Sequence, residues 1–187
     1  MMIEILVEGC LRKENGILRE AHSTVTAIIQ DDLVIIVDTS SKEYRHRLLK
    51  NLEQKGIDRH RVDMVVLTHT HADHISNLDL FPQAKILAHP LENLALVHCP
   101  VTDNELLSAG IRILHTPGHT AGSISVYVEN EQCIIAGDAI PTAENISKNL
   151  PPGICINYEM AIASMQKILS QAKCVIPGHG KEVHLPL

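Results

Sequence analysis

The ten residues VVLTHTHADH, at positions 65–74, place four metal-binding side chains directly behind an apolar run. His69 and His71 are one residue apart on a segment predicted to be extended, so both imidazoles can face one ion. Asp73 and His74 follow at the start of the next predicted helix, where they can face a second, neighbouring position. Imidazoles together with carboxylates suit zinc, iron or manganese better than calcium. The stretch therefore predicts a site for one of these metals.

Three later segments repeat this arrangement of an apolar strand followed by a sharp loop with a polar side chain. In each of them a glycine directly precedes the polar residue, and glycine permits a positive φ and a close approach of the backbone. The ends of neighbouring strands expose their loops at one edge of a sheet. We therefore expect the four loops to converge on one site. The segments are IRILHTPGHT (111–120), CIIAGDA (133–139) and CVIPGHG (174–180), with the polar residues His119, Asp138 and His179.

The order of strand-like and helix-like patterns predicts a layered α/β fold. The chain has 187 residues without a repeat or a linker, which suits one domain over residues 1–187. Apolar strands come first, and strands mixed with helices follow, as in a layered α/β sandwich. The predicted early strands are 3–7, 24–30 and 33–37, with a turn at Asp31 and Asp32, and the predicted helices are 42–55, 72–80 and 158–171.

Charge and composition narrow the range of partners. The net charge is −6 and aromatic residues make up 2%, so there is neither a basic face nor a stacking platform for bases. A small-molecule substrate is favoured over nucleic acid, and RNA remains an alternative. The five cysteines form no C-x-x-C pair, which favours a reduced interior compartment. No leader pattern or run long enough to span a bilayer is seen, so we expect a cytoplasmic protein without membrane contact.

The ordered set of motifs resembles that of the metallo-β-lactamase superfamily. THTHADH resembles the superfamily's H-x-H-x-D-H signature, and PGHT, AGDA and PGHG resemble its later metal motifs in the same order. Asp38, at the end of an early strand, resembles its first, structural motif. The resemblance covers residues 38 to 179 and implies a four-layer αββα sandwich with a dinuclear site on one edge. Within the superfamily, the chain is similar to small single-domain members of the glyoxalase II-like type.

The resemblance also implies a role for each site residue. It implies two zinc ions, with iron or manganese as alternatives, and a bridging hydroxide as the nucleophile. Such a hydroxide is available at neutral pH because a metal lowers the pKa of its bound water to about 7. Asp73 or a water is the candidate acid for the leaving group, and Asp38 is structural. The implied ligands are His69, His71 and His119 for the first ion, Asp73, His74 and His179 for the second, and Asp138 bridging both.

Segment lengths restrict the branch of the superfamily. The stretch between Asp138 and His179 is too short for the cap domain of RNA-processing members. The sequence ends at Leu187, without the C-terminal domain that binds the thiol part of the substrate in glyoxalase II, so glutathione thioesters are not expected. Substrate recognition is instead expected from three loops, 9–21, 90–110 and 141–157, or from the second subunit of a homodimer.

Three functions fit these features. The first is a dinuclear metal-dependent hydrolase that cleaves an ester, thioester, lactone or phosphodiester. The second is an oxidoreductase similar to the persulfide dioxygenases, which use one iron. The third is a non-catalytic metal-binding relative. The presence of both His74 and His179 favours the hydrolase. Around the site, His22 is a candidate for contact with the mouth and His115 for contact with a ligand, but a structural or surface role is favoured for both. Thr70 and Thr120 are candidates for hydrogen bonds to an imidazole or a carboxylate.

Overall fold

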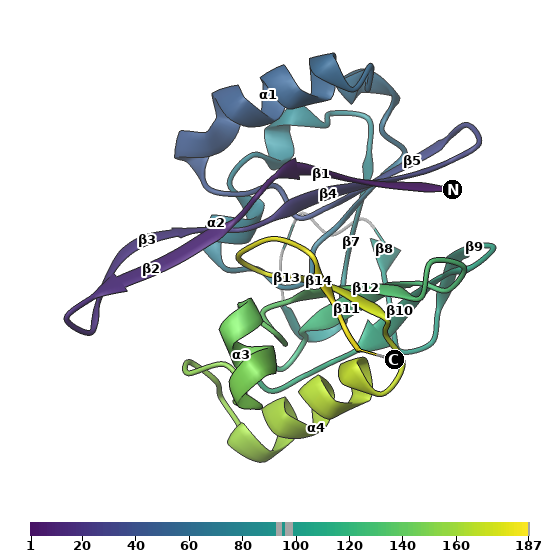
Figure 1. Ribbon diagram of the computed structural model, residues 1–187. Coiled ribbons are helices and arrows are strands. Elements are labelled where there is room, and N and C mark those ends of the chain that lie inside the picture. The colour runs from purple at the N-terminus through teal and green to yellow at the C-terminus, as the bar shows by residue number, and fades with distance from the viewer. Residues whose placement is uncertain (93–94, 96–98, 187) are drawn as a thin grey trace.

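Two six-stranded sheets pack face to face in the computed structural model, which describes residues 1–92, 95 and 99–186 (Figure 1). The first sheet has the order β1-β4-β5-β6-β7-β8 and is antiparallel from β1 to β5 and parallel from β5 to β8. Its β4–β5 hairpin turns at Asp31, whose φ of 52° confirms the predicted turn. The strands are β1 (Met2–Val7), β4 (Val25–Gln30), β5 (Leu33–Val37), β6 (Met64–Val66), β7 (Lys85–Ala88) and β8 (Cys99–Pro100).

The second sheet has the order β14-β13-β12-β11-β10-β9. Its neighbouring strands are antiparallel except for β12 and β13, which run parallel and so end at the same edge. The strands are β9 (Leu106–Ser108), β10 (Ile111–His115), β11 (Ile124–Val128), β12 (Cys133–Gly137), β13 (Cys174–Pro177) and β14 (Val183–His184).

Helices cover the outer faces of both sheets and complete the four layers of the αββα sandwich. On the first sheet α1 buries Leu48 and Leu52, and on the second sheet α4 buries Met165 and Ile168. The α-helices are α1 (Arg45–Gln54), α2 (Ala72–Ile75), α3 (Ala143–Lys148) and α4 (Tyr158–Leu169). Short 3-10 helices are η1 (Lys42–Tyr44), η2 (Arg59–Arg61), η3 (Leu78–Leu80) and η4 (Pro90–Glu92).

The alternation of side chains along the strands explains why the sheets pack as they do. In β5, Ile35 and Val37 lie in the core between the sheets, and Ile36 lies in the core under α1. In β10, Ile113 lies between the sheets and Leu114 under α4. Because both faces of these strands are buried, their sequences are almost continuously apolar. Aliphatic side chains supply nearly all of this core, as the low aromatic content requires.

The predicted helix 72–80 is wrong in its length. The helix α2 ends at Ile75, and η3 starts only at Leu78. Between them Asn77 has a φ of −117°, and its buried amide donates hydrogen bonds to the backbone carbonyls of Thr39 and Ser41, both at 2.8–2.9 Å. This tertiary contact outweighs the local preference for a continuous helix.

Two of the predicted recognition loops contain regular structure. Residues 9–21 lie mostly in a hairpin of β2 (Cys10–Glu14) and β3 (Ile17–His22) that projects from the sandwich. Its turn places Asn15 and Gly16 at φ values of 52° and 76°, as a two-residue turn requires. The stretch 141–157 contains α3. The third predicted loop, 90–110, lies partly outside the described residues.

Of the helices in the described part of the chain, none has the length and apolar character needed to cross a bilayer.

Candidate metal centre

All seven predicted ligands lie together at one edge of the sandwich. His69, His71, Asp73 and His74 follow β6, and His119 follows β10. Asp138 and His179 follow the parallel strands β12 and β13, whose carboxyl ends meet at this edge. The donor atoms form three overlapping groups in which all atoms lie within 4.8 Å of one another: His69, His71 and His119; His69, His74 and Asp138; and Asp73, His74 and His179.

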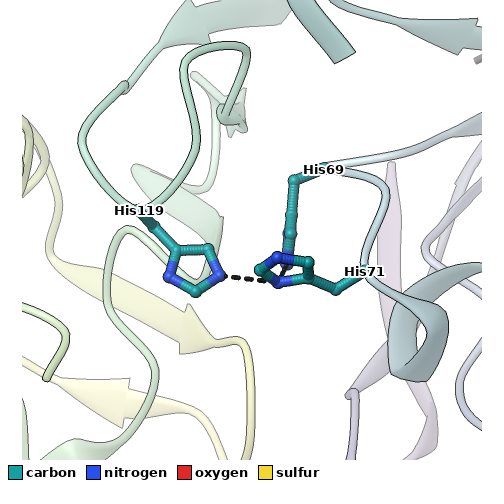
Figure 2. Close-up of side chains that lie close together, drawn as sticks. All are labelled: His69, His71 and His119. Atoms are coloured by element: carbon teal, nitrogen blue, oxygen red, sulfur yellow. Dashed lines mark hydrogen bonds between the residues drawn. The ribbon is translucent and has the colours of Figure 1, made fainter. Parts of the chain in front are cut away.

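Three imidazoles of the first group point their nitrogens at one spot (Figure 2). The Nδ1 atom of His71 lies 3.0 Å from Nε2 of His69 and 2.9 Å from Nε2 of His119. The rings stand almost at right angles to one another, at 86–89°. Three neutral imidazoles can converge in this way when they share one cation.

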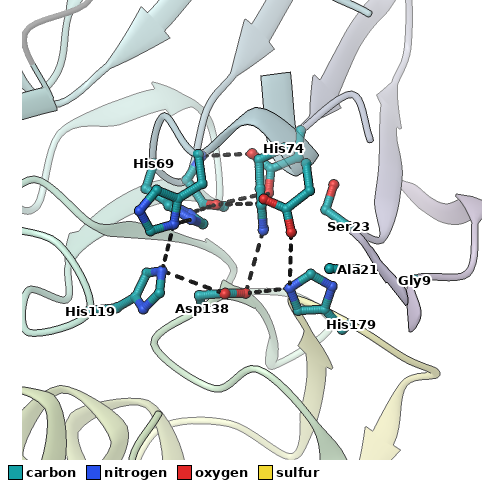
Figure 3. A network of polar contacts seen from close by, with 12 residues as sticks. Gly9, Ala21, Ser23, His69, His74, His119, Asp138 and His179 are labelled. Atoms are coloured by element: carbon teal, nitrogen blue, oxygen red, sulfur yellow. Dashed lines mark hydrogen bonds and ion pairs between the residues drawn. The ribbon is translucent and has the colours of Figure 1, made fainter. Parts of the chain in front are cut away.

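Asp138 lies between the first group, which contains His119, and the third group, which contains His74 and His179 (Figure 3). Its Oδ2 atom is 3.5 Å from Nε2 of His119, and its Oδ1 atom is 3.5 Å from Nε2 of His74 and 3.2 Å from Nε2 of His179. On the far side, Nε2 of His179 is 3.8 Å from Oδ2 of Asp73. One carboxylate therefore faces both groups of donors.

Hydrogen bonds to the outer nitrogens orient four of the five rings. Nδ1 of His69 contacts the hydroxyl of Thr68 at 3.1 Å, and Nδ1 of His74 contacts Oδ2 of Asp38 at 2.8 Å. Nδ1 of His119 contacts the carbonyl of Ile154 at 2.7 Å, and Nδ1 of His179 contacts that of His22 at 2.8 Å. Such contacts place the proton of a neutral ring on Nδ1, so that its Nε2 can offer a lone pair to a metal ion at the centre.

Asp38 is the structural carboxylate that the sequence predicts. It is buried, it lies at the end of β5 with a φ of 58°, and its Oδ1 atom accepts a hydrogen bond from the backbone N–H of Thr68 at 2.8 Å. Its Oδ2 atom accepts from the Thr68 hydroxyl at 2.8 Å and also contacts His74. The carboxylate thereby ties the loop after β5 to the loop that holds His69 and His74.

The electrostatics of the centre follow from burial and from these carboxylates. Burial disfavours the imidazolium of His74, but the charges of Asp38 and Asp138 outweigh it and raise the pKa of His74 to about 10. Burial also lowers the pKa of His69 well below its ordinary value, with a further contribution from the charge on His74. For Asp138, the imidazoles of His74 and His179 outweigh burial and hold its pKa well below the usual range. Asp138 is therefore an anion at neutral pH.

Two donor atoms at the centre suit a bound cation. Nε2 of His74 and Oδ1 of Asp138 are buried, and neither forms a hydrogen bond with any described residue. Buried polar atoms are rarely left without a partner. A metal ion would satisfy both, and the nitrogen and carboxylate oxygen donors around them are those that zinc, iron and manganese accept. The residues present therefore fit divalent metal ions.

Close packing at Gly178 explains why glycine precedes a ligand. A Cβ atom at this position would lie 2.0 Å from Oδ1 of Asp138 and 2.9 Å from the backbone of Gly137. Any side chain here would displace the carboxylate from the centre. The glycine before His179 thus leaves the space that the carboxylate occupies.

Glu92 is a site residue that the sequence analysis missed. Its Oε2 atom accepts hydrogen bonds from the backbone N–H and the hydroxyl of Thr70, both at 2.8 Å. Its Oε1 atom accepts from the hydroxyl of Thr120 at 2.5 Å and from the N–H of Gly122 at 3.1 Å. Thr70 and Thr120 were expected to bond to an imidazole or a carboxylate, and Glu92 is the carboxylate. It joins the loop of His71 to the loop of His119.

We expect Glu92→Ala to loosen the first group of histidines. Loss of the acceptor leaves several donors unsatisfied, so the free energy of unfolding should fall by about 1–3 kcal/mol. The affinity for metal should fall about 10-fold or more, because the contact orients two ligand loops. Glu92→Gln keeps one acceptor oxygen and should lose less in both. Urea unfolding and titration with zinc measure the two effects, and unchanged metal affinity in Glu92→Ala would remove Glu92 from the site.

His22 and His115 have the structural role that the sequence favours for them. The ring of His22 is buried and stacks on Tyr44 with a centroid distance of 3.5 Å, so it supports His179 through its backbone carbonyl only. The ring of His115 stacks on His89 and bonds to the carbonyl of Ala121 at 3.0 Å. In both cases residues other than the predicted metal ligands hold the ring.

A cavity of about 220 Å³ opens directly over the centre. Five of the seven predicted ligands line its floor: His71, Asp73, His119, Asp138 and His179. His71 is exposed and Asp73 is partly exposed, whereas His69 and His74 are fully buried. A substrate in this cavity would reach the site from the side of His71 and Asp73.

Known proteins match both the sequence and the fold. The family model described as the metallo-β-lactamase superfamily matches residues 18–101 and 93–179. The chain is 39% identical to the "Probable metallo-hydrolase MJ0296" of Methanocaldococcus jannaschii, covering 96% of this chain and 87% of that protein. It is 32% identical to the "Metallo-beta-lactamase domain-containing protein 1" of Xenopus laevis, covering 95% and 79%. A crystal structure from Thermotoga maritima, assigned to the metallo-β-lactamases, superposes with a TM-score of 0.79 at 21% identity, covering 98% of each chain.

The fold, the donor set and these relatives define a metal-dependent hydrolase. The chain belongs to the metallo-β-lactamase superfamily. The predicted αββα sandwich is confirmed by the sheets and helices of the structure and by this family membership.

Proposed function

We propose that this hydrolase binds two divalent metal ions. One ion is held by His69, His71 and His119, the second by Asp73, His74 and His179, and Asp138 contacts both. The observation that carries the proposal is the position of Asp138, whose two oxygens face the two groups of imidazoles at 3.2–3.5 Å. An anion that faces both groups supports two cations rather than one.

When bound, the two metal ions supply a hydroxide nucleophile near neutral pH and polarise the oxygen of the substrate. The chain provides the geometry for this chemistry. Asp38, Thr68 and Glu92 hold the ligand loops in place before substrate arrives. Asp138 stays ionised, so it does not compete as a proton donor. Because the nucleophile comes from water, no serine or cysteine nucleophile is required.

Asp73 is the acid that we assign to the leaving group. Its side chain is 27% exposed, against 11% for Asp138, and it lines the cavity over the centre. At this position the side chain of Asp73 can contact both substrate and solvent. The bonds cleaved would be those of an ester, a thioester, a lactone or a phosphodiester in a small molecule that fits the cavity.

Metal analysis together with a substrate panel tests the proposal. Mass spectrometry of protein purified anaerobically without added metal should give about two ions per chain. The loaded protein should then hydrolyse members of a panel of simple esters, thioesters, lactones and phosphodiesters. A single iron with oxygen uptake on persulfides would replace the proposal by the oxidative alternative. Absence of metal would overturn it.

Asp73→Asn separates the role as an acid from the role as a ligand. The amide keeps an oxygen donor but carries no transferable proton, so hydrolysis should fall by about 100-fold or more. The loss should be largest for alkoxide leaving groups, which need a proton, and smallest for p-nitrophenolate, which does not. The measurement is kcat across a series of leaving groups, with metal content checked in parallel. An equal loss across the series would leave Asp73 as a ligand only.

A further inference from the structure

The hairpin of β2 and β3 turns one face toward the metal centre. Two directly opposed pairs, Leu11 with Ala21 and Lys13 with Leu18, supply side chains that line the cavity over the centre. Residues that pair across two strands point to the same face of the hairpin. Leu11, Lys13, Leu18 and Ala21 therefore form one surface, which we call the inner face.

A bulge in the hairpin brings Lys13 and Leu18 together on the inner face. The pairing shifts between Arg12, which opposes Glu20, and Lys13, which opposes Leu18, so Arg19 is left without an opposite residue. In a bulge of this kind, two successive side chains lie on the same face, and the side chains that follow point to the opposite faces from those they would otherwise occupy. Arg19 and Glu20 thus share the outer face, and Leu18 turns inward beside Lys13.

Ion pairs of the hairpin distinguish its two faces. On the outer face Arg12 lies 2.6 Å from Glu14 and 3.5 Å from Glu20, and Arg19 lies 3.4 Å from Glu14. Lys13 has no acidic side chain within 4.0 Å in the described part of the chain. The hairpin's acids neutralise its arginines and leave the lysine of the inner face uncompensated.

Among the described residues, the rest of the cavity wall offers no competing polar side chain. Apart from the predicted metal ligands and Lys13, the described residues that line the cavity have apolar side chains, except Gly153, which has none. Pro141, Pro152 and Ile154 are the other apolar side chains that line the cavity outside the hairpin. A neighbouring cavity of about 600 Å³ shares Leu11 and Lys13, and its other lysine, Lys148, is paired with Glu144. Among the described residues that line the two cavities, Lys13 is thus the cation without an acidic partner.

We propose that Lys13 binds an anionic group of the substrate. The substrate class is a compact ester or thioester whose acyl part has an apolar segment against the cavity wall and a carboxylate or phosphate at Lys13. This inference rests on the proposed hydrolase function and names its substrate class. An ammonium on a flexible stem serves as a point charge that accepts either anion, without the fixed fork of an arginine.

A matched pair of substrates tests the proposal. The p-nitrophenyl esters of butanoic and succinic acid have acyl chains of equal length, and only the second carries a carboxylate. The wild-type protein, loaded with zinc, should prefer the succinyl ester in kcat/KM. Lys13→Met removes the charge and keeps the stem, and it should lower the succinyl-to-butanoyl ratio about 10-fold. The p-nitrophenyl ester of 3-phosphonopropanoic acid, whose phosphonate stands in for a phosphate, shows whether that anion is preferred over a carboxylate.

Arg19→Met is the control variant, because it removes one positive charge from the outer face of the same hairpin. It should leave the ratio unchanged, and added salt should reduce the wild-type ratio. An unchanged ratio in Lys13→Met, with both esters hydrolysed, would overturn the role of Lys13 and leave the hydrolase intact.

Binding gives a second readout that does not depend on turnover. Saturation-transfer NMR should show monomethyl succinate binding to the wild-type protein more tightly than methyl butanoate, and Lys13→Met should lose this difference. If neither ester were hydrolysed but this difference appeared, the proposed function would fail and the anion site would stand. Equal binding of both compounds by the wild-type protein would refute the anion site.

Discussion

Asp138→Ala should abolish hydrolysis and lower the metal content below two ions per chain. Asp138 is the carboxylate that faces both groups of imidazoles, with Nε2 of His119, His74 and His179 all within 3.5 Å. Loss of several kcal/mol of charge stabilisation at the reacting centre corresponds to a loss of kcat of about 1,000-fold or more. Without this anion, the remaining imidazoles must hold two cations with the single carboxylate of Asp73.

The measurement combines metal analysis by mass spectrometry with kcat on the best substrate of the panel. Asp58→Asn is the matched control, because Asp58 is a carboxylate that caps η2 and accepts a hydrogen bond from the N–H of His60 at 2.9 Å. It should retain both metal content and activity. Two ions and full activity in Asp138→Ala would refute the bridging position of this residue.

The convergence of the candidate ligands could be predicted from the sequence because each of them follows a recognisable apolar strand. The strands that end before His119, Asp138 and His179 are buried and aliphatic, and the structure brings their ends to one edge. The local spacing of His69 and His71 was likewise sufficient to place them in one group. Local signals thus specified where each ligand lies along the chain, and the regular fold brought them together.

Glu92 could not be predicted in the same way. Its four hydrogen bonds reach residues that are 22 to 30 positions away, so no pattern around Glu92 shows them. Asn77 similarly ends a predicted helix through bonds to residues 36 to 38 positions away. Polar contacts between loops depend on the assembled fold, and a sequence read in short windows does not contain them.

The β2–β3 hairpin was missed for a different reason. Its strands project from the sandwich, and residues such as Arg12, Lys13 and Arg19 are exposed, so the apolar alternation of a half-buried strand is weak. The dipeptide Asn15-Gly16 is a strong turn signal that pointed to the hairpin. The bulge at Arg19 also interrupts the alternation of side chains between the two faces of the strand. The face that this hairpin offers to the substrate could only be recognised from the pairing in the structure.

Asp38→Asn should weaken the centre although Asp38 contacts no metal position directly. The carboxylate orients His74 through a contact of 2.8 Å and holds the backbone of Thr68 at 2.8 Å. Removing one partner of a buried ionic contact costs about 3–5 kcal/mol in the free energy of unfolding. Loss of the group that orients a metal ligand lowers metal affinity by about 10- to 100-fold. Asp79→Asn is the control, since Asp79 is an exposed partner of Arg45 and should contribute about 1 kcal/mol or less.

The free energy of unfolding of the metal-free protein should depend on pH, and the direction of this dependence can be predicted. In the folded chain Asp38 and Asp138 outweigh burial and raise the pKa of His74 to about 10 from an ordinary value of 6.5. A raised pKa stabilises the fold fully below the unfolded value, and this stabilisation is lost as the pH rises through the folded value. The stability difference between the wild type and Asp38→Asn should therefore be largest near pH 6 and shrink toward pH 10. Urea unfolding in the presence of chelator, at several pH values, measures it. A difference that stays constant between pH 6 and pH 10 would show that Asp38 acts through Thr68 rather than through the charge on His74.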